Sequence, residues 1–111
     1  LRHHGRLYLT YSGSATDERY AMGMLEAQEG TDLLDPASWK KSPRPVMTTD
    51  EAHQIYGPGH NSFTRDAQGR DLLVFHARPY PGFRGSPLGD PNRNTYVWPV
   101  SYDGNDRPVF A

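Results

Sequence analysis

The residues best suited to chemistry lie in the segment 56–63, which reads Tyr-Gly-Pro-Gly-His-Asn-Ser-Phe. Gly57-Pro58-Gly59 predicts a sharp turn, because proline presets φ and glycine permits a positive φ. The turn would deliver His60 to the first position of a strand, where a neutral imidazole could bind a metal ion or orient a water molecule. The alternative, which the spacing alone favours, is a histidine that caps the turn and hydrogen-bonds a carbonyl group.

Arg78 is the second candidate, because it ends a predicted strand and opens onto the long Pro- and Gly-rich loop 79–92. Its guanidinium group could hold a carboxylate in place or donate two parallel hydrogen bonds to a bound ligand. A structural salt bridge is an equal alternative. Three aromatic side chains could stack on the rings of a bound ligand, although packing is the favoured interpretation of the first: Trp39, Trp98 and Tyr80.

The carboxylates of the chain do not predict a catalytic pair. Asp17-Glu18 and Asp50-Glu51 are adjacent residues on predicted loops, which is typical of solvated charges. The other acidic residues fall mainly at turns, where Asp needs no catalytic reason. We therefore assign no catalytic residue within the chain.

An internal repeat indicates how these residues are positioned. Residues 4–12 align with 68–76, so that Gly5 matches Gly69, and Arg44-Pro45-Val46 aligns with Arg107-Pro108-Val109. Two matches in the same order at nearly the same offset indicate stacked supersecondary units.

The expected elements are short antiparallel strands. The first unit should contain three, with its innermost strand lying before Leu1, and the second should contain four: 6–12, 20–25 and 45–48, then 60–65, 70–77, 94–102 and 108–110. This pattern predicts an all-β fold in which residues 1–49 form most of one β-propeller blade and residues 50–111 form the next. A β-sandwich of about eight strands is the competing fold. In the propeller, the connections 13–19, 48–59 and 78–93 share one face, where we expect a site.

Composition supports this fold and excludes several functions. Hydrophobic residues make up 35% of the chain, and there are 11 Gly and 10 Pro, which is a turn-rich, all-β composition. The net charge is −1 and no basic run occurs, so binding to nucleic acid through phosphate neutralisation is not expected. No apolar stretch approaches the length that spans a membrane, and there is no Cys to form a disulfide.

The chain resembles glycoside hydrolase family 43, and the resemblance covers nearly all of it. It rests on the following motifs: residues 9–12, 20–23, 34–41, 56–63, 74–78 and 90–93. The family consists of five-bladed β-propeller enzymes, the α-L-arabinofuranosidases, arabinanases and β-xylosidases. The resemblance implies that this chain contains the fourth and fifth blades, and that further blades precede it.

The resemblance also implies a mechanism and roles for two residues. In the family an inverting mechanism uses two Asp and one Glu, all of which would lie upstream of Leu1, so the isolated chain should be inactive. His60 matches a histidine that holds a metal ion, often calcium, or a water network in the central channel. Arg78 matches an arginine that supports the acid or the sugar, so both residues are expected to bind substrate.

The implied function is removal of arabinofuranosyl or xylosyl units from plant oligo- or polysaccharides, including xylan. Such polymeric substrates favour secretion or a periplasmic location. The alternative is a non-catalytic propeller module that binds carbohydrate or a protein partner through the same face.

Overall fold

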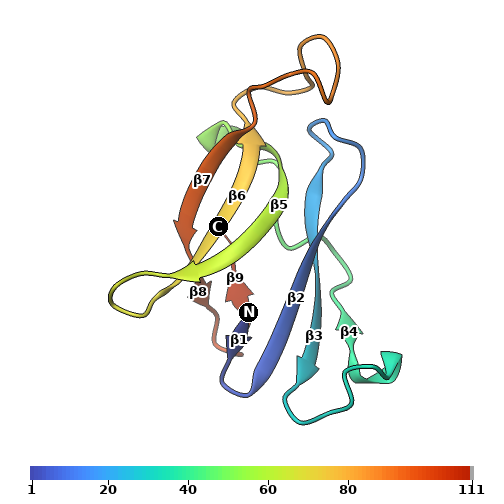
Figure 1. The fold of residues 1–111 in the computed structure, drawn as a ribbon, viewed down its shortest axis with the longest axis vertical. Coiled ribbons are helices and arrows are strands. Elements are labelled where there is room, and N and C mark those ends of the chain that lie inside the picture. The colour runs from blue at the N-terminus through green and yellow to red at the C-terminus, as the bar shows by residue number, and fades with distance from the viewer. Residues whose placement is uncertain (111) are drawn as a thin grey trace.

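The computed structural model describes residues 1–110 and shows an all-β arrangement of two antiparallel sheets lying side by side (Figure 1). Besides the strands, these residues contain two 3-10 turns, η1 at Pro36–Ser38 and η2 at Glu51–His53. Ala111, the last residue of the predicted second unit, lies outside the described residues.

The first sheet has four strands in the order β1-β2-β3-β4. Their bounds are Arg2–His3, Arg6–Gly13, Ala21–Gln28 and Lys40–Lys41. The prediction of three strands was therefore wrong, because residues 2–3 pair with β2 and supply a short first strand.

The outer edge of this sheet also differs from the prediction, which placed a strand at 45–48. The edge strand is β4, and after it the ladder stops at Pro43-Arg44-Pro45 and resumes where Val46 N–H donates to Met22 O. The interruption has a simple cause, because neither proline has an N–H to donate. Within the predicted range, only a single bridge forms, between Met47 and Met22.

The second sheet has the order β5-β6-β7, and a two-stranded ribbon, β8-β9, follows it. The bounds are Tyr56–Arg65, Asp71–Arg78 and Asn94–Pro99 for the sheet, with Ser101–Tyr102 and Pro108–Val109 for the ribbon. The predicted third strand, 94–102, is thus broken at Val100, whose N–H donates to Asp71 O.

The two sheets repeat one plan at their first hairpin. Gly5 connects β1 to β2 with φ of 77°, and Gly69 precedes β6 in the equivalent connection with φ of 78°. A left-handed backbone of this kind favours glycine. The repeat in the sequence therefore corresponds to a repeat of structure.

A shared hydrophobic core joins the sheets. Met22 and Met24 of β3 belong to the same buried cluster as Leu73 and Phe75 of β6. Alternate residues of β6 are buried in this cluster, as expected for one covered face of a strand. The core fixes the two sheets against each other, and with them the loops at their ends.

Candidate functional site

Two long connections meet at one end of the molecule, at the top of Figure 1. They are the β2–β3 connection, residues 14–20, and the β6–β7 loop, residues 79–93. The segment 48–55 contacts the first of them, because Thr49 Oγ1 donates to Glu18 O at 2.7 Å. This is the face where the sequence predicted a site.

Arg78 lies at the centre of this end and is almost completely buried, with 1% of its surface exposed. Its Nη1 donates to Thr16 O at 2.8 Å, and its Nη2 donates to Pro87 O at 2.7 Å. Its Nε lies 3.5 Å from Asp90 Oδ2. The side chain thus fastens the β6–β7 loop to the β2–β3 connection.

Asp90 is the buried anion of this loop. It accepts hydrogen bonds from the Tyr80 hydroxyl at 2.6 Å, Arg84 N–H at 2.8 Å and Asn92 N–H at 3.0 Å. These donors, with a smaller contribution from the charge of Arg78, lower the pKa of the Asp90 carboxyl from 3.8 to about 2. The carboxylate is therefore charged at every pH near neutrality and folds the loop around itself.

Three residues of the two adjacent acidic pairs, Asp17, Glu18 and Asp50, have partners within the chain, while Glu18 and Glu51 are exposed, as predicted for solvated charges. Glu18 accepts the N–H of Gly82 at 2.8 Å and so provides a second link to the β6–β7 loop. Hydrogen bonds from the Arg19 side chain and backbone lower the pKa of Asp17 to about 2. The hydrogen bond with His53 lowers the pKa of Asp50. Glu51, the first residue of η2, is exposed.

These pKa directions bear on catalysis. A general acid for glycoside hydrolysis needs a raised pKa so that it is protonated near neutrality. Asp17, Asp50 and Asp90 have lowered pKa values and are unsuited to that role.

The Gly57-Pro58-Gly59 segment is buried and lies inside β5 rather than in a turn before it, so the predicted turn was wrong. Instead of a turn, the pairing of β5 with β6 shifts its register on both sides of Gly59. Gly57 has φ of 62°, and a Cβ atom there would collide with the carbonyl oxygen of Asp17. The segment thus packs tightly against the β2–β3 connection.

His60 is exposed and has φ of 50°, an uncommon backbone conformation for this residue type. Its backbone N–H donates to Ser12 Oγ at 2.7 Å. This bond anchors the backbone and does not involve the imidazole ring. The ring centroid lies 5.7 Å from that of His76. His60 is therefore exposed on β5, whereas Arg78 at the end of β6 is buried.

Arg93 is a residue of this region that was not predicted to have a role. Its Nη2 donates to Gly57 O at 3.0 Å and to His76 O at 3.1 Å, and its guanidinium carbon lies 5.2 Å from the centroid of the Tyr20 ring. Among residues 1–110, its buried Nη1 has no hydrogen-bond partner. The only signal in the sequence is that Arg93 ends the motif 90–93.

The three candidate stacking aromatics have packing roles. The Trp98 ring packs edge-on against Phe75 at 5.0 Å. Trp39 Nε1 donates to Leu33 O at 3.0 Å near η1, and Tyr80 binds Asp90.

A groove of about 370 Å³ lies on the first sheet rather than at His60 or Arg78. Tyr11, Lys41 and Arg44 are among the residues that line it, and Lys41 Nζ lies 5.8 Å from the Tyr11 ring centroid. The candidate residues and the groove are therefore separate features. No helix within residues 1–110 is long and apolar enough to cross a membrane.

Comparison with known proteins identifies related sequences. The model of the family described as glycosyl hydrolases family 43 matches residues 1–108. An extracellular exo-α-(1→5)-L-arabinofuranosidase of Streptomyces avermitilis is 50% identical over 112 residues, covering 100% of this chain and 23% of the relative. The α-L-arabinofuranosidase 43 of Humicola insolens is 44% identical with the same coverage of both chains.

A solved structure identifies the fold. The crystal structure of an α-L-arabinofuranosidase from Lactobacillus brevis matches with a TM-score of 0.94 and 51% identity, covering 100% of this chain and 34% of the other. The two sheets are accordingly blades of a β-propeller, and the alternative of a β-sandwich is excluded. The chain spans about a quarter of the curated relatives and a third of the solved structure.

Proposed function

We propose, because this chain belongs to glycosyl hydrolases family 43, that it is the C-terminal part of an enzyme that hydrolyses α-L-arabinofuranosyl linkages in plant oligo- or polysaccharides. The observation that carries the proposal is the 50% identity to an exo-α-(1→5)-L-arabinofuranosidase over the whole chain. The first relatives are all arabinofuranosidases, which favours arabinofuranosyl over xylosyl substrates. The first is also extracellular, which supports secretion of this protein.

In this proposal, residues 1–49 form most of the fourth blade and residues 50–111 the fifth blade of a five-bladed ring. The earlier blades supply the catalytic Asp, Asp and Glu. The lowered pKa values of Asp17, Asp50 and Asp90 make these three residues unsuited to act as the general acid. The role of this chain is then to complete the ring and to place the loops around the sugar.

We assign His60 and Arg78 to substrate binding by different routes. His60 is exposed and free to reach the substrate directly or through water. Arg78 is buried, and its hydrogen bonds hold the β6–β7 loop, so its contribution to sugar binding acts through the position of that loop.

Calcium at His60 is a separate prediction, and the described residues do not fit it by themselves. Calcium takes six to eight oxygen ligands. His60 does not belong to a cluster of three His, Asp or Glu side chains in residues 1–110, and its aromatic neighbour is His76. We therefore derive no step through calcium.

We propose inversion of configuration at the anomeric carbon, which requires two carboxyl groups far enough apart to admit a water molecule. Proton NMR of the first product tests this. Hydrolysis of an α-L-arabinofuranoside by inversion releases the β-anomer first. Initial appearance of the α-anomer would contradict the proposal.

Activity itself is tested by incubating the intact protein, meaning this chain with the rest of its polypeptide, with aryl α-L-arabinofuranoside and aryl β-D-xyloside. The proposal predicts turnover of the arabinofuranoside in preference to the xyloside. Absence of both activities, together with measurable binding of arabinan or of a protein partner, would support the non-catalytic module instead.

A further inference from the structure

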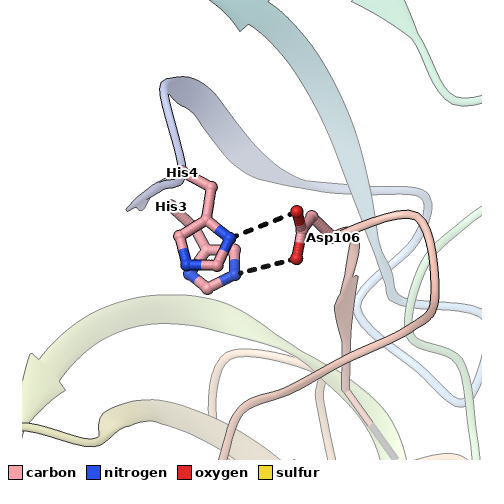
Figure 2. Close-up of side chains that lie close together, drawn as sticks. All are labelled: His3, His4 and Asp106. Carbon is pink, nitrogen blue, oxygen red and sulfur yellow. Dashed lines mark ion pairs between the residues drawn. The ribbon is translucent and has the colours of Figure 1, made fainter.

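Two histidines and an aspartate from opposite ends of the sequence meet at the end of the molecule that carries β1, β8 and β9, away from the β6–β7 loop (Figure 1), and Figure 2 shows their side chains. His3 ends β1 and His4 begins the turn into β2, while Asp106 lies in the turn between β8 and β9. His3 Nε2 lies 3.5 Å from Asp106 Oδ1, and His4 Nδ1 lies 3.1 Å from Asp106 Oδ2.

We propose that His3, His4 and Asp106 form a zinc site. One ligand atom from each side chain lies within 4.8 Å of the other two. Ligands bound to a tetrahedral zinc ion at 2.0–2.1 Å are separated by about 3.3 Å. The two nitrogen–oxygen distances, 3.1 and 3.5 Å, lie on either side of that value. These distances end on different oxygens of Asp106, and the His3 and His4 rings are stacked, so the exposed His4 ring must turn out of the stack for both nitrogens and one carboxylate oxygen to face a common ion.

His3 and Asp106 are positioned before any ion binds. The His3 ring is stacked between that of His4, at 3.8 Å, and that of Tyr102, at 3.5 Å. Asp106 is fixed through its backbone, because its N–H donates to Asp103 O and its carbonyl accepts the Tyr8 hydroxyl. Such fixing reduces the entropy that an ion must overcome on binding.

The donor set selects the class of metal. Imidazole suits zinc, copper and nickel, whereas calcium requires more oxygen ligands than one carboxylate provides. Two histidines and one carboxylate leave the fourth tetrahedral position for water, as in other zinc sites with three protein ligands. The exposed side chains of His4 (66%) and Asp106 (49%) leave room for that water.

The consequence is a cross-link between the first hairpin and the last one. Binding to the folded form alone raises stability by mass action. Because the cluster lies at the opposite end from the β6–β7 loop, zinc should change the melting temperature rather than sugar recognition.

The test uses the intact protein without a polyhistidine tag, freed of metal by EDTA and titrated with zinc chloride by calorimetry. His4→Asn and Asp106→Asn each remove one ligand, and asparagine tolerates the positive φ of 46° and 60° at these positions. We expect each variant to lose one zinc equivalent or to bind it at least about tenfold more weakly. Zinc should also raise the melting temperature of the wild type but not of the variants.

His53→Asn is the matched control, because His53 also pairs with a carboxylate, that of Asp50 at 2.7 Å, and has positive-φ Gln54 next to it. This variant should bind zinc as the wild type does. Cobalt(II) provides a second measurement, since a tetrahedral cobalt spectrum that disappears in Asp106→Asn reports the site even if His4→Asn folds poorly. Zinc binding and a cobalt spectrum unchanged in both ligand variants would overturn the proposal.

Discussion

The Nε atom of Arg78 lies 3.5 Å from Oδ2 of Asp90, and both side chains are buried beneath the β6–β7 loop. The same guanidinium group donates to the carbonyl oxygens of Thr16 and Pro87, which belong to two different connections. A single cation therefore neutralises the loop's carboxylate and joins two loops. These contacts attach a long segment rich in Pro and Gly to the sheet and to the β2–β3 connection at the face proposed to meet the sugar.

Replacing Arg78 distinguishes a structural role in the β6–β7 loop from direct contact with the sugar. Arg78→Ala leaves the Asp90 carboxylate buried without its cation, and loss of one partner of a buried pair typically costs about 3–5 kcal/mol of stability. We expect a lower melting temperature for the intact protein. A direct contact with the sugar would in addition lower kcat/KM by about 2–4 kcal/mol of transition-state stabilisation. Arg84→Ala, which removes an exposed guanidinium above the Tyr80 ring, is the control.

Low pH should destabilise the β6–β7 loop, because it protonates the Asp90 carboxylate. Its pKa is lowered from 3.8 to about 2, so its stabilising effect is complete above pH 3.8 and is lost as the pH falls towards 2. The difference in melting temperature between wild type and Asp90→Asn should be constant above about pH 5 and should shrink below pH 4. Tyr80→Phe removes the largest contribution to the shift, so the loss should be smaller and should be complete at a higher pH than in the wild type. A difference that does not depend on pH would exclude this role.

The sequence predicted the repeated plan better than the edges of the sheets. The matching positions of Gly5 and Gly69 follow from local backbone requirements, so they were visible in the sequence. The two-residue strand β1 and the displaced edge strand β4 were missed, because they depend on pairing with distant residues rather than on their own pattern.

The candidate site was likewise predicted only where local sequence determines it. The position of Arg78 at the end of a strand was predictable, but its carbonyl partners were not, since Thr16 lies 62 residues away in the sequence. Arg93 and Glu18 were missed for the same reason. The cluster of His3, His4 and Asp106 unites residues that no local motif could connect.

Gly57 provides a test of the close packing beneath His60. Gly57→Ala combines a positive φ of 62° with a collision against the Asp17 carbonyl, and should cost about 2–5 kcal/mol in the free energy of unfolding. Gly69→Ala is the matched control, because its φ is 78° but no atom lies within 4 Å of the added Cβ. It should cost only about 1–2 kcal/mol. Urea unfolding measures both free energies. Equal losses in the two variants would show that the collision with the Asp17 carbonyl adds nothing to the cost of the positive φ.

His60 should affect turnover more than substrate affinity. His60→Asn keeps a residue type that accepts its φ of 50° and removes the imidazole. If the imidazole acts through water or a metal ion, kcat should fall about 10–100-fold while KM changes little. His53→Asn, at an exposed histidine in η2, should leave both constants unchanged. A large rise in KM with unchanged kcat would instead indicate a direct contact with the ground-state sugar.

The central claim is that this chain completes a glycosidase without supplying its catalytic carboxylates. The most direct measurement compares hydrolysis of an aryl α-L-arabinofuranoside by the intact protein with hydrolysis by residues 1–111 alone. We predict turnover by the intact protein and none above background by the isolated chain, because a positioned general acid typically contributes about 10²–10⁴-fold to the rate. Robust turnover by residues 1–111 that is abolished by Asp50→Asn or Glu51→Gln would contradict the account.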